Sequence, residues 1–588
     1  YIENGVAQGG GTVGPEDEFN EQNFFREAFE ISYDYFLGNH QLHGGFQWYE
    51  VSEELIRTSN GWGRISATGG RDSLGDGTPV YYEGRFQQLT LAQTVPSIDS
   101  FFESMSFEVN DTFTFGSDWT FNVGLLFSND TYFGSGLRET GQGVSGFEVA
   151  PGNKYEMYDI GFSDMIQPRA GATWSPDGRS KAYGSYARYN PAASSLPRAA
   201  SWDRNLAREI DAQFAEDGTF LALDAVRSSS GKVFQDGIDP RYIDEFLVGY
   251  DRQLFDRMTA RSHFRYRKGR NFWEDTNNTA RVAYEPPAGI PREPYVPNLD
   301  EIRDEIGGSS YVIAQLDDAF TDYYEVSLEA DYRTTKYFVQ ASYVWSQYYG
   351  NFDQDNTTTE NDQDTFIGSS FIADGAGRQL WNNRYGYLRG DRRNQIKIFG
   401  YYNFAWDGSA GAWIAYQDGQ PWEPWNVEVY REFTGSTSDT SRYAEPAGIN
   451  RTDNHFQMDL NYTQNFRFGS RYNVKLRADL FNLFDSQTGY NIQNKVNSAN
   501  FGGSRDFFNP RRLQLAVGRA LLRLHLVAEH MNRAARRRVE ADHRAQQHGL
   551  SGPRAANDPE NLAFSHVEVE VVVHHVGPEL VAQPADPD

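Results

Sequence analysis

The segment NVKLRADLFNLFD, from Asn473 to Asp485, decides the fold class of this chain. From Val474 to Leu480 every second side chain is apolar, and the side chains between them are polar or charged. An amphipathic helix would instead place apolar residues three and four positions apart. An extended strand with this alternation has one apolar face and one charged face. Such a strand suits a wall between lipid and water, and the sequel FFNPRRLQLAV, Phe507–Val517, continues the wall.

The same alternation recurs along the chain in pairs of segments joined by short turns, which is typical of β-hairpins. Seven such hairpins and a final strand give about fifteen strands. The predicted strands lie near residues 25–37, 42–48, 107–115, 119–127, 166–174, 180–189, 246–250, 258–266, 324–332, 337–345, 396–402, 410–416, 456–462, 473–480 and 511–517.

Long polar segments alternate with the short turns, so that all short turns would lie at one end of a closed sheet. In outer-membrane β-barrels the short turns are periplasmic and the long loops are extracellular. The sequence therefore predicts an all-β chain that forms a transmembrane antiparallel β-barrel. The expected long loops are near residues 50–100, 128–163, 191–242, 270–321, 347–392, 418–453 and 486–507.

The composition supports a sheet with a thin apolar layer. The 588 residues are only 39% hydrophobic but 15% aromatic, and aromatic side chains with a polar tip settle at membrane interfaces. No apolar run reaches the length of a membrane-spanning helix. A net charge of -27 argues against a nucleic-acid partner. The absence of cysteine excludes thiolate metal sites and disulfides.

Five segments of the sequence resemble TonB-dependent outer-membrane receptors over roughly residues 25 to 517. FNLFD at 481–485 and NPRRLQLAV at 509–517 resemble the end of these receptors. VNDTFTFGSDWTFNVGL, PRAGATWSPDGRSKAYGSYARY and DRRNQIKIFGYYNF resemble the barrel of the Oar-like branch, which bears a carboxypeptidase-regulatory domain. The resemblance implies a plugged barrel in the outer membrane of a Gram-negative bacterium. It also implies a TonB box near the amino terminus and uptake driven by the inner-membrane proton gradient.

The resemblance further implies that the chain holds part of a larger receptor. The family's barrel has 22 strands, so we expect the plug, the TonB box and about seven strands to lie outside the chain. Residues 1–24 are expected to be a loop remnant, and residues 25–517 a partial barrel. The composition changes abruptly after Val517, which favours a frameshifted or disordered tail at 518–588. The alternative is a genuine periplasmic extension with a helix near 521–540 and a strand near 567–573.

No enzyme motif is present, since the sequence contains no HExxH, no GxSxG and no phosphate-binding glycine loop. We therefore predict neither catalysis nor a cofactor. The acidic run at 353–364 is either a calcium site or a solvated loop, and we favour the loop because it lacks EF-hand spacing. His574 and His575 are either metal ligands or disordered residues, and we favour disorder. The prediction for metals is accordingly none.

Two groups of aromatic residues are candidates for binding an extracellular small molecule, sugar or peptide. In QPWEPW, Gln420–Trp425, two prolines would hold two tryptophans near the barrel mouth as flat apolar surfaces. A second aromatic group stands beside arginines upstream. In both cases the alternative is that the rings anchor the barrel at the membrane interface, and for QPWEPW we favour anchoring. The candidate ligand-binding residues are Trp422, Trp425, Trp381, Tyr385 and Arg389.

A basic row on one predicted strand is expected to line the lumen, because the alternate row is apolar. This row either guides an anionic solute or contacts acidic residues of a plug, and we favour the plug. The lumen-lining residues are Arg261, His263, Arg265 and Arg267.

Three functions remain open from the sequence. The favoured one is a receptor that imports a scarce siderophore, oligosaccharide or peptide, with the outer-membrane bilayer and TonB as partners. TonB would act through the part that precedes this chain. The second is an adhesion or secretion-related barrel that imports nothing. The third is a soluble carbohydrate-binding β-protein, which the charged inner rows and aromatic outer rows argue against.

Overall fold

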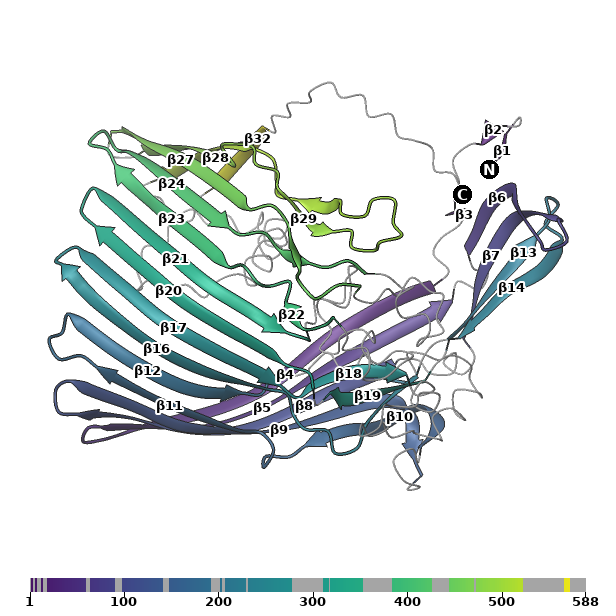
Figure 1. Ribbon diagram of the computed structural model, residues 1–588, viewed down its shortest axis with the longest axis horizontal. Helices are drawn as coiled ribbons and strands as arrows, with labels where there is room; N and C mark the ends of the chain where they lie inside the picture. Colours follow the sequence, from purple (N-terminus) through teal and green to yellow (C-terminus); the bar gives the residue numbers. More distant parts are fainter. Residues whose placement is uncertain are drawn as a thin grey trace.

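The computed structural model is all-β, and within its described residues no helix is long and apolar enough to span a membrane. Its strands fall into one large antiparallel sheet and several small ones (Figure 1). The structure describes residues 2–3, 6–7, 12–13, 18–59, 64–89, 98–140, 147–191, 201–202, 207–228, 231–277, 310–316, 318–352, 383–425, 444–469, 472–521 and 565–571.

The large sheet curls into a barrel, which confirms the predicted fold class, and it contains all fifteen predicted strands. The expected total of 22 strands and the expected plug stay predictions. The strands of the wall, in spatial order, are β4 (Glu18–Leu37), β5 (His40–Ser59), β8 (Ile98–Phe115), β9 (Trp119–Glu139), β11 (Ile166–Trp174), β12 (Ser180–Tyr189), β16 (Tyr242–Phe255), β17 (Met258–Arg270), β20 (Thr321–Arg333), β21 (Tyr337–Gly350), β23 (Asn394–Asn403), β24 (Gly408–Gln417), β27 (His455–Phe468), β28 (Tyr472–Phe481) and β31 (Arg512–Leu521).

The wall departs from the predicted boundaries at both ends of the chain. β4 begins at Glu18, so part of the segment 1–24 is strand rather than loop. The short strands β1 (Ile2–Glu3) and β2 (Val6–Ala7) lie before it and pair with each other. β31 continues to Leu521, past Val517, and pairs with β32 (Ser565–Val571) of the tail.

The long segments between hairpins are not loops throughout, contrary to the sequence prediction. They form a five-stranded sheet and a three-stranded sheet, seen at the end of the barrel opposite the short turns in Figure 1. The first sheet contains β3 (Thr12–Val13), β6 (Arg64–Ser73), β7 (Pro79–Leu89), β13 (Ala207–Phe214) and β14 (Phe220–Ser228). The second contains β15 (Gly231–Phe234), β18 (Phe272–Asn277) and β19 (Ser310–Leu316), and β10 (Phe147–Ile160) extends the wall beside β9.

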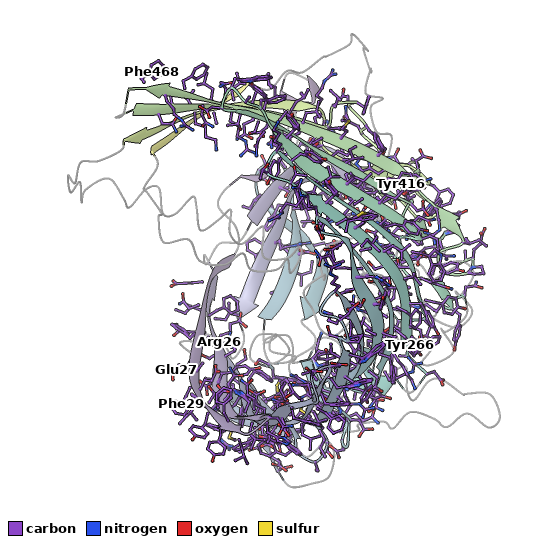
Figure 2. The ribbon with its side chains drawn as sticks, turned by 90° about the vertical axis from the view of Figure 1, so that its left-hand side faces the viewer. Arg26, Glu27, Phe29, Tyr266, Tyr416 and Phe468 are labelled. Carbon is purple, nitrogen blue, oxygen red and sulfur yellow. The ribbon has the colours of Figure 1, made fainter. Side chains whose placement is uncertain are left out.

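The outer face of the wall carries the apolar row of each strand. Phe29 on β4, Val248 on β16 and Leu328 on β20 are 55%, 63% and 49% exposed. Figure 2 views the barrel from the short-turn end and shows side chains on both faces of the wall. On the outer face, Tyr266 stacks against Tyr324 with ring centroids 4.8 Å apart. An exposed apolar band with interfacial aromatic rings is the exterior of an outer-membrane barrel, which places the wall in that bilayer.

A hydrophobic core lies on the inner side of the wall at the long-loop end. Phe102 and Tyr132 alternate with the exposed outer row of β8 and β9, so they point inward, and both are buried. They pack with Phe234, Trp273 and Ile313 from the three-stranded sheet. The Trp273 Nε1 donates a hydrogen bond of 2.7 Å to the Asp239 carbonyl oxygen. The long segments thus fold against the inner surface of the barrel at this end.

Candidate ligand-binding site

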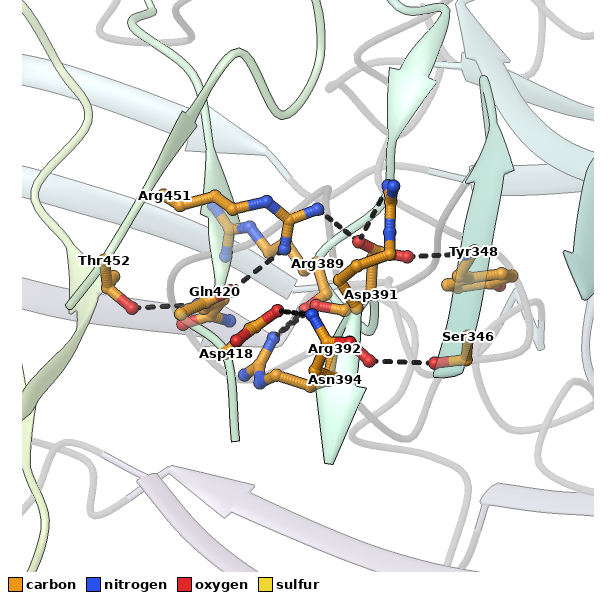
Figure 3. Close-up of polar contacts among 12 residues, drawn as sticks. Ser346, Tyr348, Arg389, Asp391, Arg392, Asn394, Asp418, Gln420, Arg451 and Thr452 are labelled. Atoms are coloured by element: carbon orange, nitrogen blue, oxygen red, sulfur yellow. Dashed lines mark hydrogen bonds and ion pairs between the residues drawn. The ribbon is translucent and has the colours of Figure 1, made fainter. Parts of the chain in front are cut away.

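A cluster of arginines lies where β21, β23, β24 and β27 reach the long-loop end (Figure 3). Four of its members are Arg389, Arg392, Arg393 and Arg451. The first three precede β23, and Arg451 belongs to β26 (Asn450–Arg451), which pairs with β25 (Pro421–Trp422). The chain therefore returns to the same place after sixty residues, where Arg451 meets Asp391 and completes the cluster.

Asp391 organises these arginines from a fully buried position. Its Oδ1 accepts a hydrogen bond of 2.7 Å from the backbone N–H of Tyr348 on β21. Its Oδ2 pairs with the Arg451 Nη2 and lies 3.8 Å from the Arg393 Nη2. The carboxyl side chain has no exposure, whereas both guanidinium side chains are 29% exposed. One buried carboxylate thus fixes two cations that still face solvent.

Arg392 is held by backbone groups instead of a carboxylate. Its Nη1 donates 2.9 Å hydrogen bonds to the carbonyl oxygens of Arg389 and Asp391. The Ser346 Oγ donates a 2.8 Å hydrogen bond to the Arg392 carbonyl oxygen. Burial, together with repulsion from Arg451, lowers the pKa of Arg392 to about 10. Arg392 therefore remains charged at neutral pH beside the two cations that Asp391 holds.

Aromatic rings border the cations on one side. The Tyr387 ring on β22 (Gly386–Tyr387) has the Arg393 guanidinium 4.7 Å and the Arg451 guanidinium 5.5 Å from its centroid. Next to it, Tyr349 lies 5.8 Å away in an edge-on contact. Tyr385, two residues upstream, is 45% exposed. A planar or apolar part of a ligand could lie on these rings while its anionic groups meet the guanidinium groups.

A hydrogen-bonded group on the other side fixes the ends of the strands. Asn394 donates from Nδ2 to the Asp418 Oδ2 at 2.6 Å and accepts from the Tyr343 hydroxyl at 2.8 Å. Tyr416 donates to the Asp418 Oδ1 at 2.9 Å. Asp418 is therefore satisfied by neutral donors, and the strand ends that carry the arginines are held in place.

The two tryptophans of QPWEPW differ in their placement. Trp425 is only 2% exposed, and its Nε1 donates a 2.7 Å hydrogen bond to the buried Glu423. This corrects the expectation of an exposed platform, because a buried ring offers no face to a ligand. Trp422 is half-buried and meets Phe501 edge-on at 6.0 Å. Trp381 lies outside the described residues.

Arg389 joins the two groups of predicted residues, since its guanidinium carbon lies 5.9 Å from the Trp425 ring centroid. The structure therefore brings Arg389, Tyr385 and the QPWEPW segment to the same end of the barrel. The sequence pointed to Tyr387 as a member of the second aromatic group, but it did not point to Asp391 or Arg451 as site residues. The run of charges at 391–393 was visible, but only the pairing of β25 with β26 shows where Arg451 belongs.

The basic row on β17 lies on the face opposite the exposed apolar row, and carboxylates of the wall already neutralise it. Its partners are carboxylates on the two neighbouring strands, β16 and β20, so neither a free basic track nor a plug is needed to pair these cations. The pairs are Arg261 with Glu329 at 2.7 Å and Asp331 at 2.6 Å, His263 with Glu325 at 2.7 Å, Arg265 with Glu325 at 3.4 Å and Glu245 at 3.6 Å, and Arg267 with Glu245 at 2.5 Å.

The two metal alternatives cannot be placed, because residues 353–364 and His574 and His575 lie outside the described residues. Among the described residues, no group of three or more histidine, aspartate and glutamate side chains is arranged to hold a metal ion.

No protein-family model and no curated protein matches the chain. Solved structures with a similar fold include the outer membrane transporter YddB from Escherichia coli, with 12% identity, a TM-score of 0.47, and coverage of 85% of this chain and 63% of that one. The siderophore receptor PiuA from Acinetobacter baumannii has 11% identity, a TM-score of 0.46 and coverage of 85% and 56%. The ferric citrate transporter FecA has 11% identity, a TM-score of 0.46 and coverage of 87% and 57%. The chain thus spans less than two thirds of these structures, and the likeness concerns the fold alone.

Proposed function

We propose that this chain belongs to an outer-membrane receptor that captures an anionic nutrient, such as a metal-loaded siderophore, at the mouth of the barrel. The observation that carries the proposal is the arginine cluster around Asp391. Asp391 holds Arg393 and Arg451 with their guanidinium groups partly exposed, and Arg389 and Arg392 lie in the same cluster, in a protein whose net charge is -27.

The chemistry of this cluster fits carboxylate, phenolate or phosphate groups better than a neutral ligand. Guanidinium groups bind such groups through paired, charge-assisted hydrogen bonds. Asp391 is fully buried beneath two of the guanidinium groups, so their outer faces remain available to solvent. Tyr385 and Tyr387 add aromatic surface beside the charges. Among the nutrients considered from the sequence, siderophores combine anionic and planar groups, which neutral oligosaccharides do not.

Import driven by TonB is the second part of the proposal. It rests on the resemblance of the strand and turn segments to TonB-dependent receptors, which implies that a plug and a TonB box belong to the complete protein. Binding at the mouth would precede plug movement and passage to the periplasm. No covalent chemistry is required, so the proposed receptor is not an enzyme.

The test of the binding step is titration calorimetry on the purified full chain in detergent, with ferric citrate, a ferric catecholate siderophore and a neutral maltooligosaccharide as probes. We expect Arg451→Gln to weaken binding of an anionic probe by about 10- to 100-fold, because it removes a charge-assisted hydrogen bond worth about 1.5–3 kcal/mol. Arg477→Gln is the matched control, since Arg477 pairs with Asp479 on β28, outside this cluster.

The proposal fails if the neutral sugar binds as tightly as the anionic probes, or if the control variant loses as much affinity as Arg451→Gln. Uptake of the bound probe by cells with and without TonB tests the transport step. Binding without TonB-dependent uptake would favour the adhesion or secretion alternative.

A further inference from the structure

A groove of about 540 Å³ lies on the outer face of five adjacent strands of the wall, β16, β17, β20, β21 and β23, which run side by side in Figure 1. Alternate residues of a strand lie on one face, and most residues that line the groove belong to the outward row of their strand. They are Tyr250, Arg252, Leu254, Ala260, Ser262, Leu328, Ala330, Ala341, Tyr343, Ile396 and Ile398.

The register of the sheet explains the shape of the groove. Ala260, Ala330 and Ala341 are direct neighbours across β17, β20 and β21, so three small side chains form a floor. The next outward position on β20 and its partner on β21 are large, Leu328 and Tyr343. Across five strands spaced about 4.8 Å apart the groove is roughly 19 Å long, a length that suits one extended acyl chain.

The groove opens to the lipid side and not to the lumen. Leu254 and Leu328 are 46% and 49% exposed, as expected for the outer row. The alternate residues of these strands face inward, and two of them, Arg261 and Glu329, form an ion pair at 2.7 Å. A binding partner in this groove must therefore come from the bilayer.

Arg252 lies at one end of the alanine floor, since it is the direct neighbour of Ala260. It stands three residues before the end of β16 at Phe255, about 10 Å along the strand, and an arginine side chain can extend over much of that distance toward the interface. Asp177 acts on Arg252 electrostatically, but its Oδ1 already accepts backbone hydrogen bonds of 2.9 Å from Arg179 and 2.6 Å from Ser180.

The short-turn end beneath the groove carries an excess of exposed cations. These cations are Arg179, Arg252, Arg257, Arg333 and Lys336. Among the described residues, none of the five forms an ion pair within 4.0 Å. The turns that hold them contain two acidic residues, Asp177 and Asp256.

The opposite end of the same strands differs. There Arg188 forms a double hydrogen bond with Asp244 at 2.8 and 2.9 Å, and Arg270 pairs with Asp322 at 3.2 Å. Arg188 and Arg270 are therefore neutralised by neighbouring carboxylates, whereas Arg252 and Arg257 at the short-turn end have no such carboxylate partner among the described residues.

We propose that this groove and its arginines bind an anionic glycerophospholipid of the periplasmic leaflet. One acyl chain lies on the alanine floor, and the phosphate group meets Arg252 and Arg257. Short turns of outer-membrane barrels are periplasmic, which puts these arginines at the level of phospholipid headgroups. Guanidinium groups bind phosphate through paired hydrogen bonds, and basic residues near a membrane surface attract anionic lipid.

Native mass spectrometry of the full chain, released from bilayer discs of equal phosphatidylglycerol and phosphatidylcholine with palmitoyl and oleoyl chains, tests the proposal. We expect phosphatidylglycerol to be retained in preference to phosphatidylcholine. Arg252→Gln and Arg257→Gln should each lower that retention about fivefold, as the attraction of one surface cation predicts. Ala330→Phe, which fills the floor, should lower retention of both lipids.

Two controls separate the site from general effects. Arg477→Gln removes one lumenal charge, and Ala412→Phe enlarges an outward side chain on β24 that does not line the groove. Neither should change lipid retention. Folding is checked by the heat-dependent gel shift of the barrel. If Ala330→Phe does not fold, lipid retention by the two arginine variants is the test of the proposal.

Equal retention of the two lipids by the wild-type chain would overturn the proposal. Loss of retention in Arg477→Gln as large as in Arg252→Gln would do the same. Dimers that disappear in Ala330→Phe, in the absence of retained lipid, would assign the groove to a second copy. None of these outcomes depends on the nutrient bound at the barrel mouth.

Discussion

Replacing Asp391 by asparagine tests whether one buried carboxylate holds the arginine cluster together. The amide keeps the shape of the side chain and an oxygen that can accept from the Tyr348 N–H, but it removes the negative charge opposite Arg393 and Arg451. Hydrogen bonds to charged groups contribute about 1.5–3 kcal/mol each.

The expected loss is smaller than the sum of two such bonds. The Arg393 contact is long at 3.8 Å, and both guanidinium side chains are 29% exposed, so water screens their interaction with Asp391. We expect Asp391→Asn to lower the local free energy of opening by about 2 kcal/mol. An opening equilibrium that is 2 kcal/mol easier raises the rate of amide hydrogen exchange roughly 30-fold.

Hydrogen exchange followed by mass spectrometry, on peptides that contain Tyr348 and Arg451, measures this change. The matched control is Asp418→Asn, because Asp418 accepts only from the neutral groups of Asn394 and Tyr416. We expect the control to change exchange at Tyr348 by less than about threefold. If Asp391→Asn leaves exchange within threefold of wild type, Asp391 does not organise the cluster and the reasoning is wrong.

Three further substitutions test other parts of the fold. Burial raises the pKa of Asp130 to about 6, at a level of β9 where the outer row has become polar at Asn129 and Thr131. Because this pKa lies above the ordinary aspartate value of about 3.9, the unfolded chain ionises first and stability falls as pH rises from about 4 to 6. Asp130→Asn should therefore be up to about 3 kcal/mol more stable than wild type at pH 8 and equal to it near pH 3.5 in thermal melts. Glu325→Gln should destabilise the barrel by about 1–3 kcal/mol in urea unfolding, because Glu325 accepts from His263, Arg265 and Tyr323, and a loss below 0.5 kcal/mol would contradict the lumenal pairing. Trp425→Ala should cost about 3–5 kcal/mol in the same assay, more than Trp422→Ala, and the reverse order would contradict the assigned burial of Trp425.

The strands of the barrel wall could be predicted because the sequence pattern that marks them lies within each strand and its neighbouring turn. An alternation of period two marks a strand whose faces meet lipid and water, and each hairpin partner follows within a few residues. The sheets at the long-loop end were not predictable in this way. β7 and β13 are 128 residues apart at their first residues, yet they pair and are joined by the ion pair of Arg85 with Asp211 at 3.0 Å.

The candidate site shows the same division. Tyr385 and Arg389 could be selected from the sequence because aromatic and basic residues are neighbours there. The burial of Trp425 could not, since it depends on a bridge to Lys495 and on a backbone hydrogen bond of 2.8 Å to Asn494 in a distant loop. Arg451 was missed for a similar reason, because its meeting with Asp391 depends on strand pairing rather than on local sequence.

The ion pairs along β16, β17 and β20 have a consequence for the passage of charged solutes. Opposite charges on neighbouring strands are about 5 Å apart, which is less than the Debye length of about 8 Å at physiological salt. Their electric field therefore cancels within a short distance of the wall. This side of the barrel therefore neither attracts nor repels an ion according to the sign of its charge. Conductance along it should show little preference between cations and anions. In the proposed receptor, discrimination between anionic and neutral solutes would then depend on the arginines at the entrance.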